Sequence, residues 1–182
     1  MPMLMWAGTD EWRAEAAQVE RHEDRFAATG VQLGTGPAPY RLDYVLETTA
    51  GWVTSSLAIT AQGDGWRRTL ELSRDPQGRW AGVDGAVALN DALDCDLGFS
   101  PLTNSMPILR HRLHERAGVA ECAMAWVSVP DLTVHRSLQR YEHVRTTPDG
   151  AIVRFSSADF TADLVVDAGG FVVDYPQLAT AA

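Results

Sequence analysis

The sequence predicts a mostly β protein, built as a single-domain curved antiparallel sheet or open β-barrel with little helix. Two observations predict this fold: apolar and polar residues alternate over many short stretches, and turn signals recur between these stretches. Such regular short strands are typical of sheets, sandwiches and barrels. The length of 182 residues fits one domain, since domains commonly hold roughly 100–150 residues. We therefore expect one domain over residues 1–182.

The clearest strand in the first half begins at Tyr40. Tyr40, Leu42 and Tyr44 alternate with charged residues, as expected of a strand with one buried face. The next predicted strands are joined by turns that include an Asp-Gly pair at Asp64-Gly65, which suits a hairpin. These further strands are Trp52–Thr60, Trp66–Ser73 and Arg79–Ala81.

The middle third has a different pattern. Val87–Arg112 is expected to be a long connection, because Pro101 and Pro107 are unfavourable in a regular helix or a central strand. Alternation then resumes and predicts five further strands, at Val119–Val129, Leu132–Arg145, Ala151–Ser156, Phe160–Asp167 and Phe171–Tyr175.

The N-terminal segment Asp10–Ala28 is ambiguous. It is rich in Ala, Glu and Arg, and Asp10 could cap a helix. Its apolar stripe, however, is thin, with Trp12, Ala16, Val19 and Phe26 as members. On pattern alone, a helix and a strand are equally consistent with this segment.

Composition and charge narrow the class of partner. All 15 basic residues are arginine, and with 24 acidic residues they give a formal net charge of −9. An acidic chain without a basic run is not expected to bind nucleic acid or to dock on an anionic membrane. No apolar run approaches the roughly 18 residues of a membrane span, and the first residues include no basic segment of a signal peptide. We expect a cytoplasmic protein without stable membrane insertion.

Four acidic residues crowd the middle segment: Asp84, Asp91, Asp94 and Asp96. Paired carboxylates can act as general acid and base or gather a hard cation. The simpler interpretation is that they cap turns and pair with arginines. Since no zinc, phosphate-loop or nucleophile-elbow motif occurs, we expect no metal and no cofactor. Cys95 and Cys122 lack a CxxC spacing and are expected to be free thiols.

Aromatic residues fall on or beside many of the predicted strands. Rings with polar edges can line a cavity for an amphipathic or glycosylated ligand. They can equally fill the core of the sheet, and the sequence leaves both roles open. The residues concerned are Trp52, Trp66, Trp80, Trp126, Tyr40, Tyr44, Tyr141 and Tyr175.

The chain resembles a bacterial family described as "putative glycolipid-binding". The resemblance rests on Leu93-Asp94-Cys95-Asp96-Leu97, on Pro101-x-Thr103-Asn104-x-x-Pro107-Ile108, on Gln139-Arg140-Tyr141 and on the tail from Val166 to Pro176. It covers nearly the whole chain. The family implies one mostly β domain shaped like the periplasmic carriers of lipoproteins and glycolipids, which are incomplete barrels that hold acyl chains. It also implies strands around Ala16–Glu20 and Phe26–Gln32, and we follow it there.

Together these inferences predict non-catalytic binding of a lipid or glycolipid in an apolar cavity of an open barrel. Under this hypothesis Trp52, Trp66, Trp80 and Tyr141 line or gate the cavity, Arg110 and Arg140 meet a head group, and Thr103 and Asn104 shape the loop at the mouth. Two alternatives remain. One is an enzyme of unknown class that uses Asp84, Asp94 and Asp96, and the other is a protein-interaction module that uses a sheet edge or an apolar patch.

Overall fold

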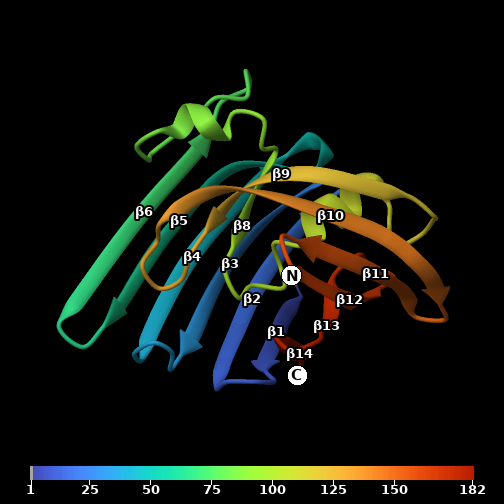
Figure 1. Cartoon of the computed structure of the whole chain (residues 1–182), viewed down its shortest axis with the longest axis horizontal. Helices are drawn as coiled ribbons and strands as arrows, with labels where there is room; N and C mark the ends of the chain where they lie inside the picture. Colours follow the sequence, from blue (N-terminus) through green and yellow to red (C-terminus); the bar gives the residue numbers. More distant parts are fainter. Residues whose placement is uncertain (1) are drawn as a thin grey trace.

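Fourteen strands form one sheet in the computed structural model, which describes residues 2–182 (Figure 1). The first half of the sheet consists of β1 (Met3–Gly8), β2 (Arg13–His22), β3 (Arg25–Gly34), β4 (Tyr40–Thr49), β5 (Val53–Gly63), β6 (Trp66–Arg74) and β7 (Trp80–Ala81). The second half consists of β8 (Asp94–Leu97), β9 (Val119–Val127), β10 (Val134–Thr147), β11 (Gly150–Ser157), β12 (Phe160–Asp167), β13 (Val172–Tyr175) and β14 (Ala179–Ala181).

The strand order explains why the sheet curves without closing. It runs β7-β6-β5-β4-β3-β2-β1-β14-β13-β12-β11-β10-β9-β8, so β1 and β14 join the two halves. Neighbouring strands are antiparallel except β8 and β9, which are parallel. Because β7 and β8 form the two ends of this order and do not pair with each other, the sheet is not a closed barrel. The predicted mostly β, open architecture is confirmed.

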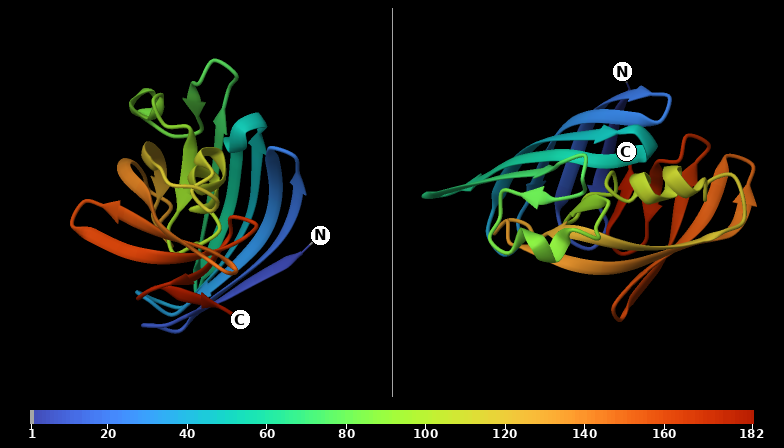
Figure 2. Two further views of the ribbon diagram at one scale, coloured as in Figure 1. Left: turned by 90° about the vertical axis from the view of Figure 1, so that its right-hand side faces the viewer. Right: turned by 90° about the horizontal axis from the view of Figure 1, so that it is seen from above.

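A connecting segment with the helix α1 (Ser105–His111) lies between the two halves of the sheet (Figure 2). Two short 3₁₀ turns, η1 (Ala50–Trp52) and η2 (Ala86–Leu89), complete the elements. Leu102 and Met106 pack with the core of the first half, whereas Ile108 and Leu113 pack with that of the second half. The connecting segment therefore fills much of the space that the curved sheet encloses.

The strands predicted from alternation are confirmed, and so are the strands that the family resemblance implied near the N-terminus. In β4 the buried and exposed residues alternate almost without exception, as its sequence predicts. The helical interpretation of residues 10–28 is wrong, because this segment forms β2 and β3, paired antiparallel from Arg13–Gly34 to His22–Arg25. Pairing on both edges of β2 outweighs the local helix propensity of its alanines and glutamates.

The expectation that prolines bar a helix from the middle segment is wrong for Pro107. Pro107 occupies the third position of α1, and proline is tolerated in the first turn because the N–H groups there have no partner within the helix. The short strand β8 in the same segment was also not predicted. It has only four residues, all buried, so it shows no alternation. Within residues 2–182 no helix is long and apolar enough to cross a membrane.

Candidate functional site

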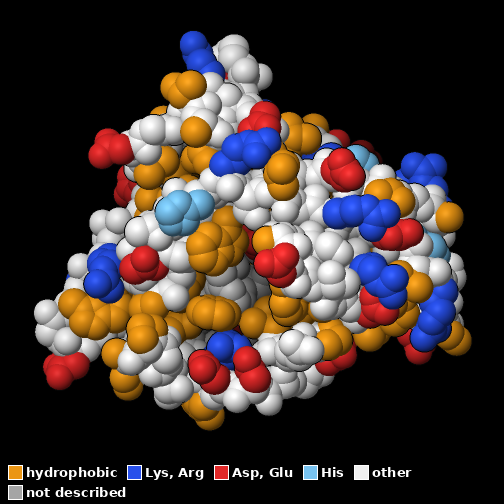
Figure 3. Space-filling model, viewed as in Figure 1, with side chains coloured by type: hydrophobic (Ala, Val, Ile, Leu, Met, Phe, Trp, Pro, Cys, Tyr) orange, Lys and Arg blue, Asp and Glu red, His pale blue; other side chains and the backbone are white. Residues whose placement is uncertain are grey.

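A hollow of about 960 Å³ opens on one face of the molecule, beside the turn that follows β8. Figure 3 shows this face hollowed near its centre, with hydrophobic side chains around the opening. Residues from β8 to β12, from the turn 97–104 and from Tyr175 and Leu178 line it. Small-molecule sites commonly measure about 300–1,000 Å³, so this hollow has room for a sizeable ligand.

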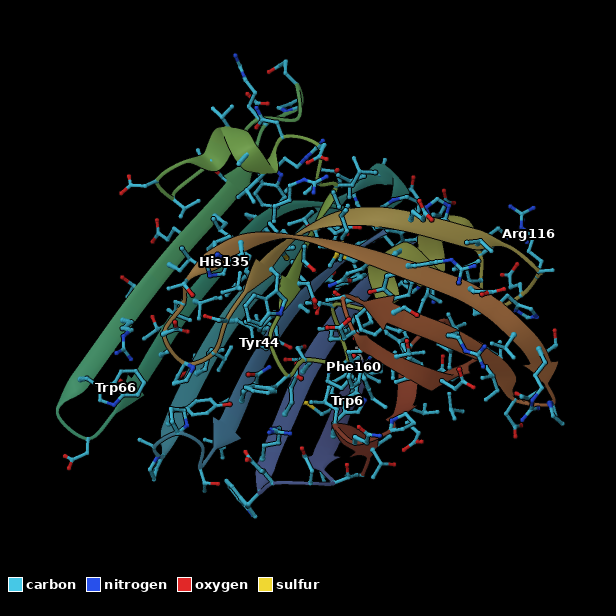
Figure 4. The ribbon with its side chains drawn as sticks, in the orientation of Figure 1. Trp6, Tyr44, Trp66, Arg116, His135 and Phe160 are labelled. Atoms are coloured by element: carbon cyan, nitrogen blue, oxygen red, sulfur yellow. The ribbon has the colours of Figure 1, made fainter. Side chains whose placement is uncertain are left out.

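One wall of the hollow is aromatic. The ring of Phe155 lies 6.1 Å from that of Phe160 and 6.0 Å from that of Tyr175, measured between centroids. On its other side Phe155 packs on the buried ring of Tyr141, at 5.3 Å. Figure 4 shows Phe160 near the middle of this face, close to where the two halves of the sheet meet. Tilted and edge-on rings at these distances attract one another and form a stiff apolar surface.

The opposite wall comes from the β9–β10 pair. Trp126 and His135 are register partners on these strands, and their rings stack with centroids 6.1 Å apart. Phe99 and Phe160 are each 38% exposed, and both residues line the hollow together with Trp126 and His135. The rim therefore presents apolar surface to solvent.

The floor of the hollow is polar. Asp96, Asn104 and Gln139 line it, although each is less than 9% exposed. Asp96 accepts hydrogen bonds from the Gln139 amide at 2.6 Å and from the Thr103 hydroxyl at 2.8 Å. The Tyr141 hydroxyl donates to Gln139 Oε1 at 2.8 Å and accepts from the Asn104 amide at 2.9 Å. These five side chains form one connected network, which we call the polar floor.

Burial dominates the electrostatics of this network. Desolvation raises the pKa of Asp96 to about 6, although the hydrogen bonds from Gln139 and Thr103 favour its charged form. The pKa of the Tyr141 hydroxyl is raised well above its ordinary value, mainly by burial and also by the nearby Asp96 carboxylate. Tyr141 is therefore a neutral hydrogen-bond donor at any physiological pH.

A second buried carboxyl lies on the other side of the same turn. Glu15 Oε1 accepts hydrogen bonds from the Tyr44 hydroxyl at 2.6 Å and from the Ser100 hydroxyl at 2.7 Å. Glu15 Oε2 and Gln32 Oε1 are buried without a hydrogen-bond partner in the described residues. Both side chains border a space of about 10 Å³, which is roughly the size of one water molecule. Burial raises the pKa of Glu15 to about 7.

The structure brings three of the residues predicted to bind ligand into the polar floor. These are Thr103, Asn104 and Tyr141, which come from the connecting segment and from β10. Asn104 lines the hollow and is 3% exposed, whereas Thr103 is 1% exposed and lies behind the lining, where its hydroxyl donates to Asp96. They were predicted at its mouth, and the inward course of the connecting segment accounts for this difference.

The three predicted tryptophans do not line the hollow. Trp52 and Trp80 are buried in the core of the first half, where Trp80 Nε1 donates a hydrogen bond to the Ala92 carbonyl at 3.0 Å. Trp66 lies near the end of the β5–β6 hairpin, away from the centre of the hollowed face (Figure 4). The guanidinium of Arg68 covers its ring at 4.5 Å.

The two predicted head-group arginines have protein partners. Arg110 forms two hydrogen bonds to the Asp94 carboxylate, one of them 2.7 Å long, and its other donors reach the carbonyls of Gly51 and Trp52 at 2.8 and 2.9 Å. It thereby ties α1 to η1 and β8. Arg140 pairs with Glu142 at 2.6 Å on a half-exposed part of β10. Neither arginine borders the hollow.

Of the four crowded aspartates, Asp96 alone lines the hollow. Asp94 is engaged by Arg110, and Asp91 pairs with Arg136 across the surface at 2.9 Å. In the described part of the chain, no three His, Cys, Asp or Glu side chains gather as a metal site would require. Cys95 and Cys122 are free thiols, as the sequence predicts.

Several residues of the hollow were not singled out from the sequence as ligand contacts. They include Asp96, Gln139, Phe155 and Phe160, whereas Tyr175 was named only among the rings that could line a cavity or fill the core. Gln139 could have been predicted, because alternation along β10 places it on the same face as Tyr141. The aromatic wall, in contrast, depends on how β11, β12 and β13 pack, which a single sequence does not reveal.

The fold and the hollow define a class: mostly β proteins whose single curved sheet stays open beside an internal hollow. The chain belongs to the family described as "putative glycolipid-binding", which matches residues 3–181. It is similar to the crystal structure of a DUF1089-family protein from Pseudomonas aeruginosa, with 27% sequence identity, 91% of each chain covered and a TM-score of 0.72. No curated protein matches the chain.

Proposed function

We propose that this protein binds a lipid or glycolipid non-covalently in the hollow. The observation that carries the proposal is the aromatic wall of Phe155, Phe160 and Tyr175, which faces a space of about 960 Å³. Burial of about ten methylenes against such a wall contributes about 8 kcal/mol. This is the free energy of a micromolar complex, before the cost of association is subtracted. The family description points to the same ligand class.

The proposed role is binding without covalent chemistry. The carboxylate of the hollow is held within the protein, since Asp96 already accepts hydrogen bonds from two side chains. Burial raises the pKa of the Cys95 thiol to about 12, which leaves it protonated and unreactive as a nucleophile. The sheet and the connecting segment thus supply a shaped, largely apolar space.

The test uses N-phenyl-1-naphthylamine, an uncharged apolar dye that fluoresces strongly when it leaves water. We expect saturable binding with one dye per protein. Ser157→Trp places a large ring in the hollow, because Ser157 lines it. This variant should weaken dye binding at least about tenfold, which corresponds to about 1.4 kcal/mol.

Ser156→Trp is the matched control, since the neighbouring residue of β11 points to the opposite face of the sheet. Both serines hydrogen-bond through their hydroxyls, so both substitutions remove a similar contact. Equal dye affinity in the two variants, or no saturable binding by the unmodified protein, would show that the hollow is not a ligand site. Native mass spectrometry of the purified protein would separately reveal a retained lipid.

A further inference from the structure

The hollow contains a buried polar patch beside its aromatic wall, and this patch concerns the orientation of the ligand in the function proposed above. Asp96, Asn104 and Gln139 line it at 8%, 3% and 4% exposure, together with equally buried apolar residues such as Phe155 and Tyr175. The aromatic wall continues outward to Phe160, which is 38% exposed. A hydrocarbon chain inserted to the bottom would desolvate the polar side chains without offering hydrogen bonds in return.

The floor has hydrogen-bonding capacity that the protein does not use. Asn104 is the N-cap residue of α1, yet its side chain makes no capping hydrogen bond. The amide nitrogen of Asn104 donates to Tyr141, and Asn104 lines the hollow. Its amide oxygen is not one of the buried side-chain atoms of residues 2–182 that lack a partner. A ligand hydroxyl in the hollow can donate a hydrogen bond to this oxygen.

The charges around the floor discriminate between head groups. Asp96 is the acidic side chain on the floor, and its hydrogen-bond partners Gln139 and Thr103 are neutral. The basic residues among the lining are Arg136, which is paired with Asp91, and His135, whose ring stacks on Trp126. An anionic head group on the floor would therefore meet the Asp96 carboxylate. An uncharged hydroxyl both donates and accepts, so it suits the carboxylate and amide oxygens as well as the amide N–H groups.

We propose that the hollow takes its ligand head first. An uncharged, hydroxyl-bearing head group rests on Asp96, Asn104 and Gln139, the members of the polar floor that line the hollow, and the hydrocarbon chain follows the aromatic wall outward to the exposed ring of Phe160. The apolar side chains at the rim, which are exposed to solvent in the free protein, then pack against the outer end of the hydrocarbon chain.

The experiment compares ligands that share a dodecyl chain, each titrated calorimetrically below its micelle concentration. These are dodecyl β-glucoside, the same glucoside with a dansyl group on the terminal carbon of its chain, dodecyl phosphate and dodecyltrimethylammonium. We expect the glucoside to bind at least about tenfold more tightly than the phosphate and the ammonium. The reason is that its hydroxyls form one or more hydrogen bonds with the polar floor that the charged head groups do not form. The dansyl-labelled glucoside should bind about as well as the unlabelled one, because its chain end lies at the open rim.

Two variants assign the effect to the floor. Asn104→Leu should weaken glucoside binding about tenfold and leave phosphate binding unchanged, since it removes one neutral hydrogen-bonding group. Phe160→Leu is the control on the aromatic wall and should weaken both ligands alike. If Asn104→Leu does not fold, Asp96→Asn tests the floor instead. It should reduce the ratio between the affinities for the glucoside and for the phosphate, because it removes the carboxylate that disfavours an anionic head group.

The possible outcomes separate this inference from the proposed function. Equal or tighter binding of phosphate or ammonium would overturn the uncharged head group. Loss of binding with the dansyl-labelled chain would show that the chain end, not the head, lies deepest. In each of these cases dye and dodecyl ligands still bind, so the proposed function stands. Failure of both the naphthylamine dye and every dodecyl ligand to bind would overturn both.

Discussion

The hydroxyl of Ser100 donates a 2.7 Å hydrogen bond to the carboxyl of Glu15, which lies 85 positions earlier in the chain. Glu15 belongs to β2 in the first half of the sheet, and Ser100 belongs to the turn that borders the hollow. The same turn is held from its other side by Asp96, which accepts a hydrogen bond from Thr103. Two buried carboxyls therefore fix the turn between the halves of the sheet.

Folding stability should depend on pH through Glu15. Burial raises its pKa from 4.5 to about 7, so the folded state binds this proton more tightly than the unfolded state. The contribution to stability is then complete below about pH 4.5 and is lost as the pH rises through about 7. In the unmodified protein the free energy of unfolding should fall by an amount on the order of 3 kcal/mol as the pH rises across this range, and Glu15→Gln should abolish this fall. Urea unfolding at pH 5 and pH 8 measures it.

The control for this prediction is Glu121→Gln, at an exposed position of β9. It should leave the pH dependence of the unfolding free energy as it is in the unmodified protein. A Glu15→Gln variant with an unchanged pH dependence would show that Glu15 is ionised in the folded protein at all these pH values.

The Asp94–Arg110 pair should be a major contributor to stability. Asp94 is fully buried, and Arg110 also holds the carbonyls of Gly51 and Trp52. Arg110→Ala leaves a buried carboxylate without its partner, a change that typically costs about 3–5 kcal/mol. Arg140→Ala removes a more exposed pair with Glu142 and should cost less than about 1 kcal/mol. Thermal unfolding of both variants compares them, and a small loss in Arg110→Ala would contradict the structural role.

Much of the fold could be predicted from the sequence because alternation is a local signal. Tyr40, Leu42 and Tyr44 reveal the buried face of β4 without any knowledge of its neighbours. The strands β2 and β3 could not be settled in this way, since their alanines and glutamates also suit a helix. Their pairing partners are what decide the structure there, and the family resemblance supplied this information indirectly.

The candidate site was only partly predictable for a related reason. A tryptophan that fills a core and one that lines a cavity look alike in a sequence, so nothing local separated Trp52 from Trp126. The partner of Arg110 could not be predicted either, because Asp94 lies on a short strand with no alternating pattern. Thr103, Asn104 and Tyr141 were found through a motif whose members meet in one hydrogen-bonded network.

Gly30 should be essential for the position of Tyr44. The two residues are register partners on β3 and β4, and a Cβ atom at position 30 would overlap the Tyr44 ring. Gly30→Ala should displace this ring and cost about 1–3 kcal/mol, as overpacking commonly does. Gly118→Ala is the control, because its Cβ would meet only the flexible end of Leu113, at 3.2 Å. Equal unfolding temperatures for the two variants would contradict this account.

The two cysteines should resist modification in the folded protein, and to different degrees. Cys122 is half-buried with its pKa raised to about 11 by desolvation, whereas Cys95 is fully buried with a pKa of about 12. Since the thiolate is the reactive form, Cys122 at pH 8 should react about two orders of magnitude more slowly than an ordinary exposed cysteine. Cys95 should react only after unfolding. Iodoacetamide labelling followed by peptide mapping, with and without urea, measures both sites. Labelling of Cys95 before Cys122 in the absence of urea would mean that β8 opens more readily than its burial indicates.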